Sequence, residues 1–155
     1  MITEAQPKPI KTTRLFKQAA LLTAQTVSAF NDAQIHQLAA AIPLCYHRGD
    51  NGYELAKKIE YLVERPLFVI NGPVIAALET MDSNVRKLYH EAYQHWAQET
   101  GQPVPLPFGT VCSKGIIAGI SECYDSSYLV SDNTLYPGML MLVKFNDTAV
   151  QELKP

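Results

Sequence analysis

The feature that most constrains the fold of this chain is a proline-rich break at 101–109, with the sequence Gly-Gln-Pro-Val-Pro-Leu-Pro-Phe-Gly. Three prolines at alternate positions favour an extended, stiff segment with few backbone N–H donors. Before the break, apolar residues have the spacing of helices, and after it they form short runs typical of strands. Because helices and strands segregate, the sequence predicts an α+β fold and argues against an alternating α/β fold.

The break also sets the expected organisation of the chain. We predict a helical part at about 13–100, a connector at 101–109 and a strand-rich part at 110–147. The chain has 155 residues, is 47% hydrophobic and 18% charged, and so resembles a globular protein with a real core. Since neither part has a large apolar content alone, we expect residues 1–155 to form one α+β domain. Its helical N-terminal part would pack on a small, mostly antiparallel C-terminal sheet or open barrel.

Capping residues and prolines divide the helical part into segments. We expect helices from Thr12 or Thr13 to Phe30, from Asn31 (with Gln34) to Pro43, from Asn51 (with Glu54) to Pro66, and from Pro73 to Thr80. The run from Leu67 to Ile70 is too short for a helix, and we interpret it as a buried strand.

A long helix is expected to begin at Asp82 or Ser83 and to end at Thr100, with Gly101 as its left-handed stop. Its predicted inner face consists of Val85, Leu88, Tyr89, Ala92 and Trp96, and its outer face includes Arg86, His90 and His95. Beyond the break, 110–112 and 115–120 are expected to form one strand or two, and further strands are expected at 128–130 and 139–145. The last strand has apolar residues at every position of 139–143 and is therefore expected to be buried on both sides.

Charge and cysteine content narrow the function classes. The net charge of −2 provides no global attraction to nucleic acid or to an anionic membrane, although Lys8, Lys11, Arg14 and Lys17 form a basic arm. No apolar run approaches the roughly 20 residues that span a bilayer. Three cysteines are an odd count without a disulfide framework, which favours a cytoplasmic protein.

The segment from Cys45 to Asp50 is the first candidate site. Cys45, His47 and Asp50 are the residue types of a nucleophile, its base and an orienting acid. The surrounding glycines and Asn51 favour a flexible loop instead, so we assign no catalytic residue and expect Cys45 to be dispensable. Tyr46, His47 and Arg48 are retained as candidate binding residues.

A second candidate surface lies on the long helix, where Arg86, His90 and Tyr93 are expected to be exposed. Aromatic residues and arginine are the types that most often anchor protein interfaces. No close cysteine or histidine pair has the spacing of a zinc site, and no glycine-rich phosphate loop is present, so neither a metal nor a cofactor is expected.

Three segments resemble the middle of ASCH domains, which are small PUA-like barrels proposed to bind RNA. They are Arg65–Ile70, Leu106–Val111 and Gly115–Glu122. The basic and acidic strand motif that such domains carry before the first of these strands is absent here. The resemblance implies a nucleic-acid-binding module as an alternative function.

The sequence contains no motif that fixes a reaction. Our leading hypothesis is therefore a non-enzymatic cytoplasmic binding or accessory protein, with a protein or small ligand as partner and no membrane association. A nucleic-acid-binding module is the first alternative. The second is an enzyme that uses Cys45 or the turn carboxylates Glu122, Asp125 and Asp132.

Overall fold

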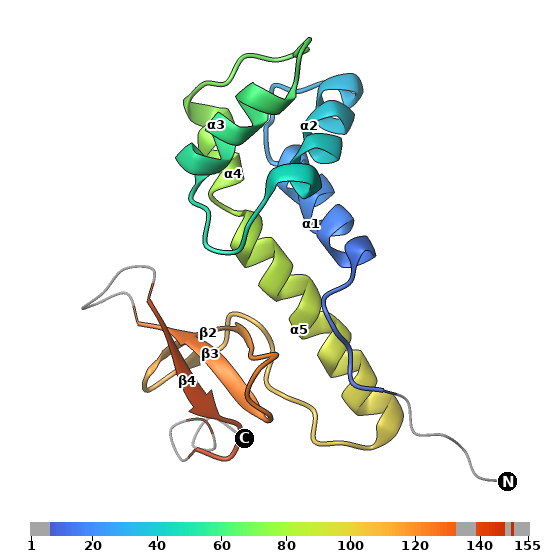
Figure 1. Cartoon of the computed structure of the whole chain (residues 1–155). Helices are drawn as coiled ribbons and strands as arrows, with labels where there is room; N and C mark the ends of the chain where they lie inside the picture. The colour runs from blue at the N-terminus through green and yellow to red at the C-terminus, as the bar shows by residue number, and fades with distance from the viewer. Residues whose placement is uncertain (1–6, 133–138, 148–149, 151–155) are drawn as a thin grey trace, which may run out of the picture. The chain divides into compact units, whose positions relative to one another are not determined.

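The computed structural model describes residues 7–132, 139–147 and 150, and it confirms the α+β fold (Figure 1). Helices occupy the chain up to Thr100, and a four-stranded antiparallel sheet follows. The chain divides into two compact units: a helical unit of residues 11–85, and a sheet unit formed by the described residues of 1–10 and 86–155. The division therefore falls within helix α5 (Met81–Thr100), not at the proline-rich segment. One cooperative domain stays a prediction, because compactness does not measure cooperativity.

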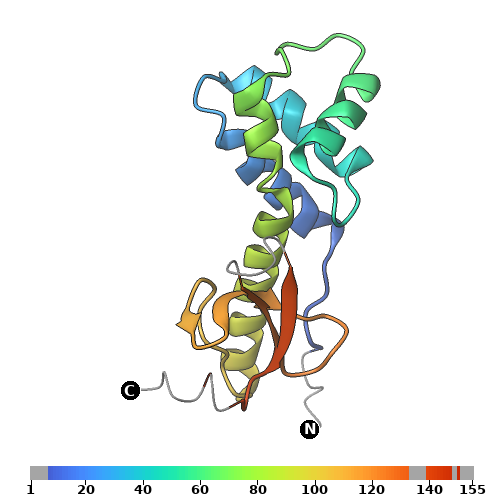
Figure 2. The ribbon, with the colours of Figure 1, turned by 90° about the vertical axis from the view of Figure 1, so that its left-hand side faces the viewer.

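The helical unit contains four helices and the start of α5. They are α1 (Thr13–Gln25), α2 (Asp32–Cys45), α3 (Gly52–Leu62) and α4 (Gly72–Leu78). Helix α1 packs against α2, and α3 packs against both α2 and α4. Figure 1 and Figure 2 both show these four helices gathered in one group. Leu38, Ile42, Leu55 and Ile59 lie fully buried among them and form the core of this unit.

The predicted helix starts are confirmed by their caps. The Thr12 hydroxyl accepts a hydrogen bond from the backbone N–H of Leu15 at 3.2 Å. Reciprocal capping boxes join Asn31 to Gln34 and Asn51 to Glu54. Each cap satisfies donors that the first helical turn leaves without a partner.

Three predicted helix ends are wrong. Helix α3 already ends at Leu62 rather than at Pro66. Helix α1 ends at Gln25 rather than Phe30, and the Thr26 hydroxyl then donates to the Thr23 carbonyl at 2.6 Å as the chain turns. Pro43 does not end the second helix, which continues to Cys45. A proline in the last turn removes one N–H donor, but the next bond, from Tyr46 N to the Ile42 carbonyl at 2.9 Å, still forms.

The predicted strand at 67–70 is also wrong, because these residues form no strand. Side-chain amides of α2 take the backbone groups that a neighbouring strand would have paired. Leu67 N donates to Gln37 Oε1 at 2.7 Å, and Gln34 Nε2 donates to the Leu67 carbonyl at 2.9 Å. Only Phe68 of this segment is buried, whereas Val69 is 76% exposed.

Helix α5 begins at Met81, one residue before the predicted start, and ends as expected before Gly101, whose φ is +72°. Its buried face recurs at every fourth residue: Met81, Val85, Tyr89, Tyr93 and Ala97, with His90 beside it. The predicted inner residues Leu88, Ala92 and Trp96 are only half-buried, so the expected stripe is partly wrong.

The sheet has the order β1-β2-β3-β4, with every pair antiparallel. Its strands are β1 (Val111–Cys112), β2 (Gly115–Ile120), β3 (Ser127–Ser131) and β4 (Leu140–Lys144), as the sequence predicts to within a few residues. The register of β2 against β3 shifts between Ile117 and Gly119. Gly119 has a φ of +147°, and a side chain there would lie 3.2 Å from Arg86 Cβ, so glycine is required at this bulge.

The prediction that β4 is buried on both sides is wrong. Met139 and Leu142 are 55% and 49% exposed, whereas Val143 is buried. Residues 133–138, between the last two predicted strands, lie outside the described residues.

Side chains of α5 join the sheet of the same unit, since Arg86 Nε donates to the Ala118 carbonyl at 2.9 Å. The N-terminal segment belongs to this unit as well. Lys8 Nζ lies 2.8 Å from an Asp125 carboxylate oxygen, and the Tyr89 hydroxyl donates to the Pro9 carbonyl at 3.0 Å. At least one cation of the predicted basic arm is therefore paired within the chain.

Candidate functional site

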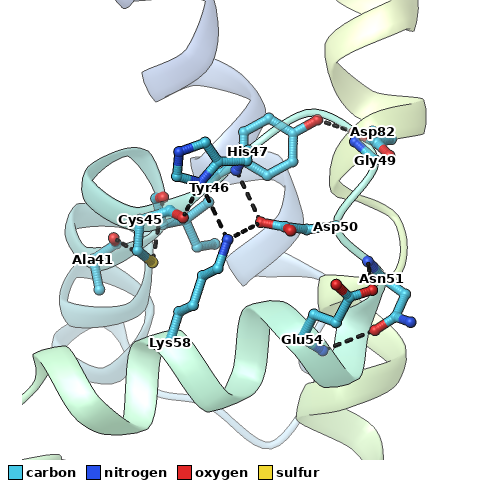
Figure 3. A network of polar contacts seen from close by, with 11 residues as sticks. Ala41, Cys45, Tyr46, His47, Gly49, Asp50, Asn51, Glu54, Lys58 and Asp82 are labelled. Carbon is cyan, nitrogen blue, oxygen red and sulfur yellow. Dashed lines mark hydrogen bonds and ion pairs between the residues drawn. The ribbon is translucent and has the colours of Figure 1, made fainter.

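The loop after α2, residues 46–51, is held by polar contacts within the helical unit (Figure 3). His47 N donates to Asp50 Oδ2 at 2.9 Å, and Asp50 N donates to the His47 carbonyl at 3.0 Å. Gly49 adopts a φ of +89° between them, a left-handed conformation that glycine allows at no steric cost. The loop is therefore a closed turn, contrary to the flexible loop expected from its glycines.

Lys58 of α3 extends this network to His47 and Asp50. Its Nζ lies 2.8 Å from Asp50 Oδ2 and 3.1 Å from His47 Nδ1. Burial acts to raise the pKa of the Asp50 carboxyl, but the bonds from Lys58 and from the His47 backbone outweigh it and hold the pKa below its usual range. The Asp50 carboxylate thus stays ionised and fixes the loop to α3.

The predicted binding residues of this loop differ in their surroundings. The Tyr46 hydroxyl donates to the Asp82 carboxylate, which also accepts from Gly49 N at 3.4 Å. Tyr46 is therefore a tie between the loop and α5. His47 and Arg48 are exposed and available to a partner.

The Cys45 thiol is not arranged as a nucleophile. Its Sγ donates to the carbonyls of Ala41 and Ile42 at 3.4 and 3.7 Å, and the His47 ring lies against the Cys45 carbonyl rather than the sulfur. Burial raises the pKa of the Cys45 thiol, and this effect outweighs the opposing charge of Lys58. A thiol with a raised pKa is a poor nucleophile at neutral pH.

Two hollows flank α3, next to this loop. A cleft of about 460 Å³ lies beside residues 63–70; its apolar lining includes Ala56, Ile59, Phe68 and Ile75, and Tyr53, Lys57 and Glu60 also line it. A shallower hollow of about 410 Å³ is lined by Cys45, His47, Lys57, Lys58, Tyr61 and Leu62. Lys57 lines both hollows, so Tyr53, Lys57 and Tyr61 form a ridge between them, which we call the α3 ridge.

The α3 ridge exposes aromatic rings to an unusual degree. Tyr61 is 94% exposed and Tyr53 is 57% exposed, and Lys57 Nζ lies 4.6 Å from the centre of the Tyr53 ring. The sequence signal for this site was two tyrosines eight residues apart, outside the apolar stripe of the helix. The cleft is not predicted from the sequence, because it depends on the path of residues 63–70, of which residues 67–70 were predicted to form a buried strand.

The second predicted surface is not the exposed patch that the sequence suggested. His90 is fully buried and Tyr93 is 6% exposed, while Arg86 is half-buried and bonded to Ala118. The expectation of exposure is wrong because the buried stripe follows residues 85, 89, 93 and 97, which turns His90 inward. Tyr93 instead contacts Trp96 and Phe145 edge-on.

His90 has an exceptional environment for an ionisable group. Its Nε2 lies 2.7 Å from the Leu106 carbonyl, whereas its Nδ1 is buried and has no hydrogen-bond partner. The ring stacks at 6.5 Å on Tyr128 and meets Phe108 edge-on at 6.0 Å. Burial lowers the pKa of His90, against smaller opposing effects of the Leu106 bond and of Glu91.

Within the described ranges, no three histidine, cysteine or acidic side chains lie together as metal ligands would. Of the turn carboxylates, Asp125 is engaged by Lys8. No helix in the described part of the chain combines the length and apolarity needed to cross a bilayer.

No known family model, curated protein or solved structure matches this chain. Interpretation of the site therefore rests on its own residues.

Proposed function

We propose that this chain is a non-enzymatic cytoplasmic binding protein that holds a protein partner on the α3 ridge and in the apolar cleft beside it. The observation that carries the proposal is the exposure of Tyr53, which lines an apolar cleft of about 460 Å³, and of Tyr61, which lines the neighbouring hollow of about 410 Å³. Large exposed apolar groups that gather around a hollow are typical of interaction sites, whereas isolated ones need no explanation.

The residue types of this face support a protein partner. Tyrosine is enriched among the residues that dominate interface energies, and it presents a large contact area with few rotatable bonds. Val69 and Leu67, 76% and 55% exposed, widen the apolar area around the segment 63–70. A partner that buried these side chains would gain about 25 cal/mol for each square ångström of apolar surface removed from water.

The nucleic-acid-binding and enzyme hypotheses receive less support from this face. Lys57 and Glu60 line the same cleft with opposite charges, whereas a nucleic-acid site needs cations that neutralise successive phosphates. The Cys45 thiol, with its raised pKa and carbonyl partners, does not favour an enzyme. The cytoplasmic setting rests on the odd cysteine count.

The proposal is tested with peptides selected from a random 15-residue display library against the full chain. Selected peptides should shift the amide resonances of residues 53–63 and 67–70 in NMR spectra. Tyr61→Ala and Val69→Asp change exposed side chains, so they should keep the fold and weaken peptide binding at least tenfold.

Tyr124→Ala is the matched control, because Tyr124 is 61% exposed in the sheet unit. It should leave binding unchanged. Failure to select any peptide, or shifts confined to other residues, would contradict the proposal.

A further inference from the structure

The proline-rich segment 103–109, which we call the strap, is held by groups that come from other elements of the sheet unit. His90 Nε2 and Gln94 Nε2, both on α5, donate to the carbonyls of Leu106 and Pro105 at 2.7 and 3.1 Å. The Leu106 N–H donates to the Tyr128 hydroxyl at 2.8 Å. The three prolines of the strap have no N–H to donate. Few backbone hydrogen bonds therefore hold the strap in place.

The contact with Leu106 fixes the protonation of His90. A carbonyl oxygen can only accept a hydrogen bond, so Nε2 must carry the proton and Nδ1 is an unprotonated acceptor. That acceptor is buried without a donor. Protonation of Nδ1 would place a second N–H and a full positive charge where no acceptor is available to them.

The groups around His90 offer little compensation for that charge. The strap contains no ionisable residue at all. Tyr128 of β3 presents its ring, and its hydroxyl is already bonded to Leu106 N. On α5 itself, Glu91 favours the charged imidazole through its own negative charge, and Arg86, one turn earlier, adds a positive charge while bonded to Ala118.

We propose that His90 is a pH-sensitive latch, which holds the strap closed when the imidazole is neutral and releases it when Nδ1 takes up a proton. The open strap exposes the ring to water, where the imidazolium is solvated and binds its proton more tightly. Proton binding therefore favours the open state by linkage.

The direction in which pH changes strap opening follows from the lowered pKa of His90. The latch is fully effective above the ordinary histidine pKa of about 6.5 and weakens as the pH falls toward the lowered value. Between these two values the opening equilibrium rises about tenfold for each pH unit. Release changes the wall of a hollow of about 420 Å³, which the strap residues 103–106 line with Tyr128 and Phe145.

The test measures hydrogen exchange of the Leu106 amide in the full chain at about pH 7.5 and pH 5.5, on either side of the ordinary histidine pKa. After correction for the intrinsic exchange rate, we expect opening to increase at the lower pH, by at most about tenfold. The His90 ring resonances should titrate below the ordinary pKa, with the same midpoint as the Leu106 amide shift.

His90→Gln provides the decisive variant, because its amide can donate to the Leu106 carbonyl but takes up no proton in this range. It should abolish the pH dependence of opening. His95→Gln is the matched control: His95 is exposed on the same helix and pairs with Glu99, so the wild-type pH dependence should persist.

Equal opening at the two pH values in the wild type would overturn the latch, as would pH-dependent opening that survives in His90→Gln. If that variant does not fold, the wild-type titration decides alone. Different midpoints for the His90 ring and the Leu106 amide would then refute the latch.

Discussion

The loop at 46–51 and the strap at 103–109 both connect regular elements, yet their backbones are held in opposite ways. The loop is closed by a side chain of its own, since the Asp50 carboxylate accepts from the His47 N–H three residues earlier, and Gly49 N adds a bond to Asp82 on α5. The strap has no polar side chain of its own to do this. Its backbone is bonded mainly from other elements, by His90, Gln94 and Tyr128 on α5 and β3 and by Ile117 on β2. A local contact, from Thr110 to the Pro107 carbonyl, closes its end.

This difference indicates where each segment is vulnerable. A turn that one of its own side chains closes keeps the contact between His47 and Asp50 when a more distant partner such as Asp82 or Lys58 is lost. A strap tied from distant elements loses a whole attachment with one side chain, and each lost partner leaves a backbone group unpaired. The following predictions sharpen or break this contrast, beginning with the largest effect.

Tyr128→Ala should destabilise the protein by about 3–5 kcal/mol, because it deletes a buried ring. This ring is 2% exposed, packs against Phe145 in a tilted arrangement with 4.4 Å between ring centres, and stacks on His90. Tyr128→Phe should cost about 1–3 kcal/mol, since Leu106 N–H loses its acceptor. Tyr46→Phe in the loop should cost at most about 1 kcal/mol. Chemical denaturation measures all three, and equal costs for the two Tyr→Phe variants would break the contrast.

Gly52→Ala tests the point at which the loop enters α3. A Cβ at this position would lie 2.3 Å from the Ile75 carbonyl oxygen and 2.9 Å from Glu79 N, and neither backbone atom can move easily. We expect a loss of about 1–3 kcal/mol in the free energy of unfolding. Gly72→Ala, the control, has nothing within 4 Å and should be neutral or stabilising by up to about 1 kcal/mol. A neutral Gly52→Ala would show that the α3–α4 packing differs from that described.

Asp50→Asn should cost about 1 kcal/mol, because it removes the ion pair with Lys58 but keeps an oxygen for the His47 N–H. The lowered pKa of Asp50 means that its carboxylate stabilises the fold at neutral pH and that this contribution disappears on acidification. The wild type should therefore lose its advantage over the variant below about pH 4. Denaturation curves at several pH values measure this difference, and an advantage that grew in acid would contradict it.

Cys45→Ser should have the smallest effect, within about 0.5 kcal/mol, because a serine hydroxyl can donate to the same carbonyls. The raised pKa of the Cys45 thiol should also make it react more slowly with a thiol reagent than the exposed Cys123. Mass spectrometry of the labelled chain measures both rates. Faster labelling of Cys45, or a hundredfold loss of an activity in Cys45→Ser, would restore the enzyme hypothesis.

Most of the fold was predictable from the sequence, because its signals are local. Asn31 and Asn51 mark their helix starts by capping chemistry that acts within three residues. The strand prediction at 67–70 is wrong because the side chains that bond this backbone, Gln34 and Gln37, lie about thirty residues earlier. A run of four apolar residues does not indicate such distant partners.

The site was less predictable, because it depends on which side of a helix faces inward. The α5 stripe could be drawn through Trp96 or through Tyr93 and Ala97, and the choice decides whether His90 lies inside or outside. Only the packing of Phe108 and Tyr128 around the imidazole settles that choice. The loop at 46–51 was visible in the sequence, but its tie to Lys58 was not.

In the sequence, the helical unit lies between the two segments that form the sheet unit. This order has a consequence during synthesis. Residues 11–85, which make up the helical unit, leave the ribosome before residues 86–155 of the sheet unit. The segment around Lys8 and Pro9 must wait for partners at Tyr89 and Asp125. We therefore expect helices α1 to α4 to form cotranslationally, whereas the sheet unit closes only when β4 has been made.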